Sequence, residues 1–114
     1  MAALEPHIRG TERVRAVFDR VRNGDVSAAD LFAEDGVILY GNGGRVEGRD
    51  AIREFYEQTI AAIHPEPQVQ AVLEVPPLYV AIVDVPSTDR HHRALDIFEL
   101  DDEGIRKLEI RSVG

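Results

Sequence analysis

The part of the chain after residue 67 carries strand-forming segments only, and this order constrains the fold more than any other feature. Apolar and β-branched residues dominate four stretches that proline or glycine turns separate: 68–75, 78–85, 91–100 and 105–113. In the last stretch Lys107 and Glu109 alternate with Leu108 and Ile110, which predicts one wet and one buried face. Because no helix separates these strands, we expect an antiparallel meander, and a doubly wound nucleotide-binding fold is disfavoured.

Helical patterns are confined to the first half of the chain. A first helix is expected over residues 11–22, and Asn23-Gly24 ends it. Its apolar stripe has the i, i+3, i+4, i+7 spacing: Val14, Val17, Phe18 and Val21. Asp25 is the predicted N-cap of a short second helix that ends near Phe32.

The clearest element of the sequence is a helix that follows Asp50, its predicted N-cap, and stops at His64-Pro65. One face of this helix carries mainly apolar and aromatic residues: Ile52, Phe55, Tyr56, Thr59, Ile60 and Ile63. Before it, the pattern predicts a strand over 37–40, a glycine-rich loop over 41–44 and a short strand over 45–47. The sequence thus predicts an α+β domain with the helices on one side of a largely antiparallel sheet.

Length and charge narrow the class of protein. The 114 residues fit a single domain, 1–114, and the absence of Cys excludes disulfides and thiol nucleophiles. A net charge of −8 argues against nucleic acid and anionic membranes as partners, since both need a basic surface. The first residues lack the apolar core of a signal peptide and no apolar run could span a membrane, so we expect a cytoplasmic protein.

Motifs for metals and cofactors are missing. The four histidines have no ligand spacing, and His91 and His92 are neighbours that point to opposite faces of a strand. Neither a dinucleotide-binding glycine pattern nor a phosphate-binding loop occurs, and no serine lies in a nucleophile elbow. We therefore expect no metal and no cofactor.

Four phrases of the sequence carry a family resemblance: 24–25 (Gly-Asp), 31–37 (Leu-Phe-Ala-Glu-Asp-Gly-Val), 46–56 (Val-Glu-Gly-Arg-Asp-Ala-Ile-Arg-Glu-Phe-Tyr) and 94–104 (Ala-Leu-Asp-Ile-Phe-Glu-Leu-Asp-Asp-Glu-Gly). In this order and spacing the chain resembles the SnoaL-like, ketosteroid isomerase-like superfamily, also called the nuclear transport factor two-like fold, over about residues 11–111. The resemblance implies a cone in which a curved, mostly antiparallel sheet of the cystatin-like type wraps around three helices from the N-terminal half. It also implies a pocket for a small apolar molecule and a homodimer through the outer sheet face.

The resemblance places an acid at Glu99, matching a carboxyl that ketosteroid isomerases keep protonated in apolar surroundings. Strand alternation agrees, because Leu95, Ile97 and Glu99 share one face, and an acid at the end of an apolar stripe is expected to have a raised pKa. The alternative is that the strand runs out into solvent at Glu99, or that Glu99 pairs with an arginine.

Two other catalytic positions of those isomerases differ here. The position of the general-base Asp is occupied by Tyr40, whose phenol stays protonated at neutral pH, and that of a first-helix Tyr is occupied by Val17. Classical steroid isomerisation is therefore not expected. Tyr56 matches a position whose phenol points into the pocket, although a core tyrosine with a satisfied hydroxyl explains the spacing equally well.

Limonene epoxide hydrolases offer a second comparison. Tyr40-Gly41-Asn42 is similar to the Tyr-x-Asn that helps those enzymes hold the attacking water, but their Arg-x-Asp pair becomes Ile82-Val83-Asp84 here. The arginine is lost, and Asp84 remains as the candidate base. It would enter the pocket if the face of Leu78, Val80 and Ile82 is inward; the alternative is a solvated strand end near Pro86.

Two classes of function follow. The first is a cofactor-free enzyme of the isomerase or polyketide cyclase type, acting by proton transfer on a small hydrophobic carbonyl or epoxide compound. Its expected catalytic residues are Glu99, Tyr40, Tyr56 and Asp84, and its expected ligand-binding residues are Val17, Phe18, Phe32, Asn42, Phe55, Ile82 and Ile97. The second is a non-catalytic module that binds an apolar ligand or dimerises, or a degenerate epoxide hydrolase-like protein.

Overall fold

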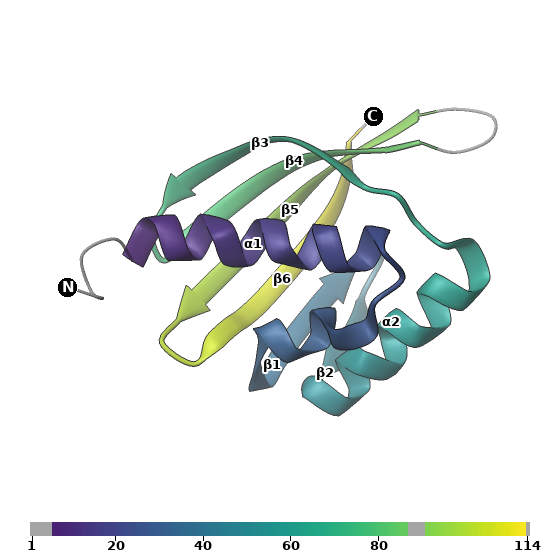
Figure 1. Ribbon diagram of the computed structural model, residues 1–114, viewed down its shortest axis with the longest axis horizontal. Coiled ribbons are helices and arrows are strands. Elements are labelled where there is room, and N and C mark those ends of the chain that lie inside the picture. Colours follow the sequence, from purple (N-terminus) through teal and green to yellow (C-terminus); the bar gives the residue numbers. More distant parts are fainter. Residues whose placement is uncertain (1–5, 87–90, 114) are drawn as a thin grey trace.

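The structure, a computed structural model, describes residues 6–86 and 91–113. Three helical elements lie in the first half of the chain: α1 (Pro6–Arg22) and the 3₁₀ helix η2 (Val26–Leu31) precede the first strand, and α2 (Arg49–Ile63) follows the second. The six strands are β1 (Phe32–Tyr40), β2 (Gly44–Glu47), β3 (Gln68–Val75), β4 (Leu78–Pro86), β5 (His91–Asp101) and β6 (Gly104–Val113). Figure 1 shows α1 and α2 on the same side of one curved sheet.

The sheet has the order β2-β1-β6-β5-β4-β3. The strands from β3 to β6 form the predicted antiparallel meander, and β2 is antiparallel to β1. The exception is the pair β1–β6, which is parallel and joins the N-terminal hairpin to the meander. The α+β fold class, with a curved, mostly antiparallel sheet and helices from the N-terminal half, is therefore confirmed.

Several element boundaries differ from the predictions. Helix α1 begins at Pro6 rather than at residue 11, so Gly10 lies within it. A methyl group at Gly10 would stand 2.3 Å from the ring of Tyr79, so a glycine allows the helix to pass this close to β4. Asp25 is the N-cap of η2, as predicted, and its side chain accepts from the Ser27 N–H. Asp50 is not the N-cap of α2, because Gly48 takes that place and Asp50 lies in the first turn.

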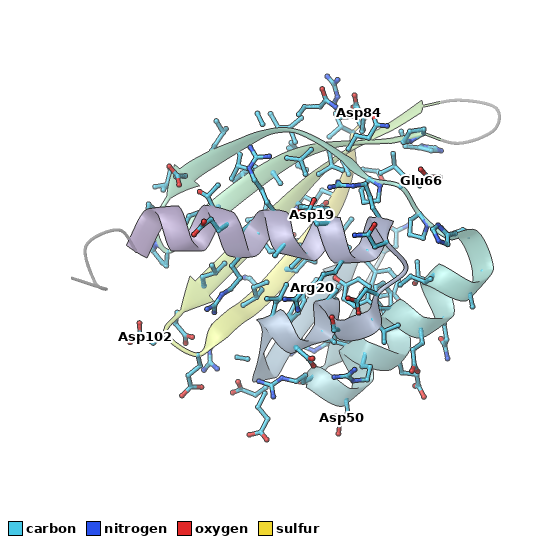
Figure 2. The ribbon with its side chains drawn as sticks, in the orientation of Figure 1. Asp19, Arg20, Asp50, Glu66, Asp84 and Asp102 are labelled. Carbon is cyan, nitrogen blue, oxygen red and sulfur yellow. The ribbon has the colours of Figure 1, made fainter. Side chains whose placement is uncertain are left out.

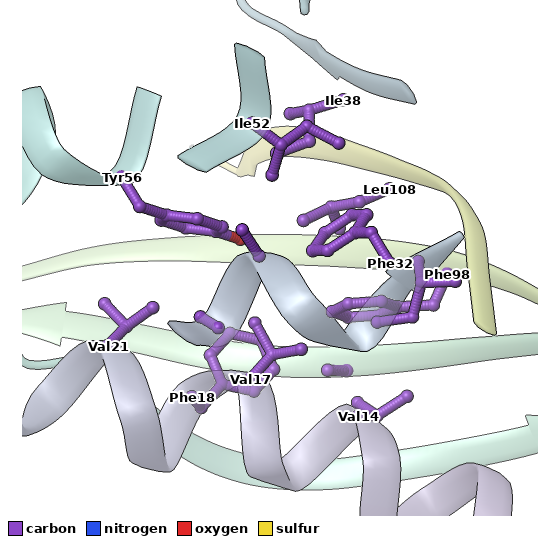
Figure 3. Close-up of a cluster of buried hydrophobic side chains, with 14 of the residues drawn as sticks. Val14, Val17, Phe18, Val21, Phe32, Ile38, Ile52, Tyr56, Phe98 and Leu108 are labelled. Carbon is purple, nitrogen blue, oxygen red and sulfur yellow. The ribbon is translucent and has the colours of Figure 1, made fainter. Parts of the chain in front are cut away.

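The core fills the space between the helices and the inner face of the sheet (Figure 3). Phe18 of α1 meets Phe98 of β5 edge to face, with ring centroids 5.8 Å apart. From α2, Ile52 and Tyr56 are buried, whereas Ile63 at the last turn is 69% exposed. Ile60 is partly buried against the core, so the predicted stripe of α2 reaches the core along the helix as far as Ile60 but not at the last turn.

The main difference from the sequence-based expectations is which faces of β4 and β5 are buried. On β5 the buried residues are Asp96 and Phe98, whereas the expected inner residue Glu99 lies on the other face. On β4 the buried residues are Tyr79, Ala81 and Val83. The stripes that the sequence analysis considered as pocket lining therefore form the outer face: Leu95, Ile97 and Glu99 on β5, and Leu78, Val80, Ile82 and Asp84 on β4. Alternation could not distinguish the faces, since both carry apolar residues.

Candidate functional site

The most unusual residue in the interior is Asp96, in the middle of β5. It is only 7% exposed, and in the described part of the chain its Oδ1 atom has no hydrogen-bond partner. Its neighbours across the sheet are Ala81 on β4 and Ile110 on β6, both apolar. Buried polar groups normally have partners, so a carboxyl oxygen without one marks a place where a ligand or a water could bind.

Burial dominates the electrostatics of Asp96. Desolvation disfavours the charged carboxylate and raises the pKa of Asp96 from 3.8 to about 7. The carboxylates that form ion pairs with arginine in the described residues are partly or fully exposed, for example Asp84 with Arg93 and Asp35 with Arg106. At neutral pH, Asp96 is therefore present both as the acid and as the carboxylate.

Tyr56 brings a hydroxyl to the same region from α2. Its side chain is buried, and its ring lies among Phe32 and Phe55, with centroid distances of 6.3 and 5.6 Å. Figure 3 shows the ring reaching from α2 into the core. Burial and the charge of Asp96 both raise the pKa of Tyr56, so the phenol stays protonated and can donate a hydrogen bond.

Tyr40 lies at the edge of this region, at the end of β1. The sheet register places Tyr40 opposite Ile110, and Ile110 opposite Asp96, so the three residues form one row on the inner face. Tyr40 is 40% exposed, and its ring packs on Phe55 with a centroid distance of 5.3 Å. Tyr40 thus belongs to the entrance and not to the buried site.

A groove with a volume of about 790 Å³ opens beside Tyr40, where β6 continues past the end of β1. Its walls come from the end of β1, the following loop, α2 and the end of β6: Leu39, Tyr40, Gly41, Asn42, Phe55, Glu109, Ile110, Arg111 and Ser112. Neither Asp96 nor Tyr56 lines it. The groove and the buried acid are neighbours that Ile110 separates.

Another depression, of about 630 Å³, lies at the opposite end of β6. It is lined by the N-terminal part of α1, the β3–β4 turn and the end of β5: Gly10, Arg13, Pro76, Pro77, Tyr79, Leu100, Asp101 and Asp102. Asp101 forms an ion pair with Arg106, and Asp102 lies at the surface turn that Figure 2 labels. This depression contains no buried carboxyl group, so we place the candidate site at Asp96.

The predicted site residues divide into three groups. Tyr40, Asn42 and Phe55 line the groove, and Tyr56 lies in the core near Asp96. Val17, Phe18 and Phe32 are core residues with almost no exposed surface. The third group lies on the outer face of the sheet: Asp84, Ile82, Ile97 and Glu99.

Glu99 and Asp84, the two predicted carboxylates, are both directed away from the helices. Glu99 lies opposite Lys107 on β6 and Leu78 on β4. The Arg93 side chain donates to Asp84 at 2.8 Å, and Figure 2 shows Asp84 near the far end of β4. The structure therefore does not bring these carboxylates together with Tyr56, and a catalytic role for either stays a prediction.

Asp96 is the residue that the sequence analysis missed. It lies in the phrase Ala94-Leu95-Asp96-Ile97-Phe98, where its charge suggests the solvent side of the strand. The signal that could have found it is the pairing of β5 with β4: Tyr79, Ala81 and Val83 are a better core face than a stripe that ends in Asp84. The residues opposite them on β5 then include Asp96.

The described residues contain no group of three His, Cys, Asp or Glu side chains that could hold a metal ion. In the described ranges no helix is both long and apolar enough to cross a membrane.

Comparison with known proteins assigns the family. A family model described as "SnoaL-like domain" matches residues 14–108. No curated protein matches the sequence. A protein from Sphaerobacter thermophilus of known structure is 30% identical with a TM-score of 0.79, and the alignment covers 90% of this chain and 94% of that chain.

Two more distant structures share the fold. A putative SnoaL-like polyketide cyclase from Jannaschia sp. CCS1 has a TM-score of 0.79 at 13% identity, covering 93% of this chain and 86% of that one. SalBIII, described as an epoxide hydrolase/cyclase-like enzyme in pyran ring formation in the polyether salinomycin, has a TM-score of 0.78 at 18% identity, covering 96% and 95%. These two structures share the fold, and the match of the family model over residues 14–108 shows that the protein belongs to the SnoaL-like domain family.

Proposed function

We propose that this protein is a cofactor-free enzyme of the cyclase type, in which Asp96 and Tyr56 act on a small hydrophobic carbonyl or epoxide compound. The observation that carries the proposal is the Asp96 carboxyl, buried among apolar residues with one oxygen that no described group satisfies. A buried carboxyl group without a partner lowers the free energy of unfolding, so a role in packing alone does not explain it. The descriptions of two solved relatives as cyclase-like enzymes support the same class.

The proposed chemistry is a proton transfer. A general base works best when its pKa is near the working pH, and the pKa of Asp96 is about 7. Ionised Asp96 takes a proton from the carbon next to the carbonyl group. Tyr56 donates a hydrogen bond to the carbonyl oxygen, where the negative charge of the enolate develops. The enolate carbon then attacks a second carbonyl carbon of the same molecule and closes the ring, and the protonated Asp96 returns its proton to the alkoxide oxygen that this attack forms.

A simple ketone tests this proposal. We expect the protein to accelerate the exchange of the methyl hydrogens of acetophenone for deuterium in D₂O, followed by NMR. Asp96→Asn should lower this rate by about 100-fold or more, the usual contribution of a general base. The rate should rise with pH through about 7, as the Asp96 carboxylate forms.

Two further variants make the test specific. Asp102→Asn changes an exposed carboxyl at the β5–β6 turn and should leave the rate unchanged. Glu99→Gln should also leave it unchanged; if this variant loses exchange while Asp96→Asn retains it, the acid is Glu99 and the assignment of Asp96 is wrong. Unfolding curves of each variant show whether a loss of exchange comes from a loss of structure.

The alternative is a binding module without chemistry. The observation that favours it is the separation of the groove from Asp96, since the groove alone could hold an apolar ligand. In that case acetophenone would perturb the NMR signals of Tyr40 and Phe55, but its methyl hydrogens would exchange no faster than in buffer.

We also propose a homodimer through the outer face of the sheet. Apolar residues on this face are exposed where β3 and β4 meet: Leu73 (55%), Val75 (69%) and Leu78 (41%). Apolar side chains that are next to one another on a surface mark an interaction site. A cytoplasmic location, and the absence of nucleic acid or membrane partners, rest on charge and composition and stay predictions.

A further inference from the structure

The groove beside Tyr40 ends one residue short of the buried acid. Its lining includes Tyr40, Phe55 and Ile110, whereas Asp96 has almost no exposed surface. A ligand in the groove would therefore contact the aromatic entrance but not the carboxyl. If Asp96 acts on a ligand, the side chains between the groove and the acid must decide which ligands arrive there.

Ile110 is the residue that separates them on the sheet. It pairs with Tyr40 across β1–β6 and with Asp96 across β5–β6, and the three side chains share the inner face. Neighbouring strands are about 4.8 Å apart, so the side chain of Ile110 occupies the space between the other two. As a β-branched residue in a strand, Ile110 has few rotamers and cannot easily swing aside.

On the helix side, Phe55 lies between the groove and the buried residues. Its ring lies between two other rings, with centroids 5.3 Å from Tyr40 and 5.6 Å from Tyr56. Phe55 lines the groove, but the next residue, Tyr56, does not. A single side chain thus separates the groove from the buried residues on each element: Ile110 separates it from Asp96 on the sheet, and Phe55 separates it from Tyr56 on α2.

We infer that Ile110 determines the size of the ligands that reach Asp96, because its side chain, facing the groove wall that Phe55 forms, lies between the groove and the carboxyl. This inference rests on the proposed function, since it assumes that Asp96 acts on a bound molecule. Small flat ligands pass beside Ile110, and larger ring systems stay in the groove. A smaller residue at position 110 joins the groove to the buried carboxyl.

Two aryl ketones of different size serve as probes, acetophenone and 2-acetonaphthone. We expect Ile110→Ala to improve the affinity for 2-acetonaphthone relative to acetophenone by about tenfold or more, because a single methylene in an apolar pocket is already worth this ratio. Leu95→Ala is the matched control: it removes a similar volume from the residue next to Asp96, but on the outer face. Its affinity ratio should equal that of the natural protein.

A titration gives a second, independent result. The carboxyl carbon signal of Asp96 reports its pKa, and in Ile110→Ala this pKa should fall toward 3.8 because water reaches the carboxyl. Leu95→Ala should leave it unchanged. If Ile110→Ala does not fold, Ile110→Val removes one methyl group, and the affinity ratio and the pKa should move in the same directions by smaller amounts.

The results separate this inference from the proposed function. The proposed function is wrong if ketone exchange does not depend on Asp96, whatever residue stands at position 110. The inference about Ile110 is overturned if both the affinity ratio and the Asp96 pKa of the folded Ile110 variants equal those of the natural protein.

Discussion

At the scale of single residues, ionisation of Asp96 lowers the stability of the folded protein. The pKa of the folded state is about 7, above the ordinary value of 3.8, so the folded protein binds its proton more tightly than the unfolded chain does. Between these two values the folded state holds more protons, and stability must fall as the pH rises. At roughly 1.4 kcal/mol per pKa unit, the full loss is on the order of 4 kcal/mol.

This sign leads to a prediction for Asp96→Asn, which cannot ionise. The free energy of unfolding of the natural protein, relative to that of the variant, should fall between about pH 4 and pH 7 and level off above this range. Urea unfolding curves of both proteins at several pH values measure the difference, and the surface carboxylates cancel in it. A difference that stays constant with pH would mean that Asp96 is hydrated or paired in the folded protein.

At the scale of elements, the β5–β6 turn depends on Gly104. Its φ of 134° is a conformation that residues with a side chain rarely adopt, and a methyl group there would lie 2.9 Å from the Leu31 carbonyl oxygen. The turn thereby packs against the end of η2 and holds β5, with Asp96, in its register with β6.

We expect Gly104→Ala to lower the free energy of unfolding by about 2–4 kcal/mol, the sum of backbone strain and a steric conflict. Gly43→Ala is the matched control, because its φ of 88° is also strained but nothing lies within 4 Å of the added methyl group. It should lose only about 1 kcal/mol, from strain alone. Equal losses in the two variants would show that the contact with Leu31 does not matter.

The elements also show what sequence patterns can and cannot predict. Local rules located the helices and the meander, because turns and periodicity are properties of neighbouring residues. The parallel pairing of β1 with β6 joins segments about 70 residues apart, and no local pattern contains it. The inner face of β5 was predicted wrongly for a related reason: Leu95 and Ile97 look like core residues until the partner strand is known.

The same distinction applies to the candidate site. The family resemblance singled out Tyr40 and Tyr56, which match pocket positions of the ketosteroid isomerases, and the apolar face of its helix supported Tyr56 independently. Asp96 was missed because a charged residue in a strand normally lies on the solvent-exposed face of the sheet. Only the tertiary arrangement, with α1 and α2 over the inner face, shows that this carboxyl is buried.

At the scale of the whole molecule, the two faces of the sheet differ in what covers them. The helices cover the inner face, whereas in the described structure nothing covers the outer face. The outer face is apolar across β3, β4 and β5 and becomes charged on β6, where Lys107, Glu109 and Arg111 lie. An apolar area with a polar margin is the usual composition of a protein interface, and a second copy of this chain supplies the same surface.

The proposed dimer predicts that the natural protein sediments with twice the mass of its 12.7 kDa chain, and that Leu73→Glu sediments as the monomer. Leu73 is 55% exposed on the outer face, so a carboxylate fits the monomer but is desolvated in the interface. Ile63→Glu is the control, because Ile63 is also exposed but lies at the end of α2. Analytical ultracentrifugation gives the masses. A natural protein that is monomeric at all concentrations, or a Leu73→Glu variant that stays dimeric, would require a different role for the outer face.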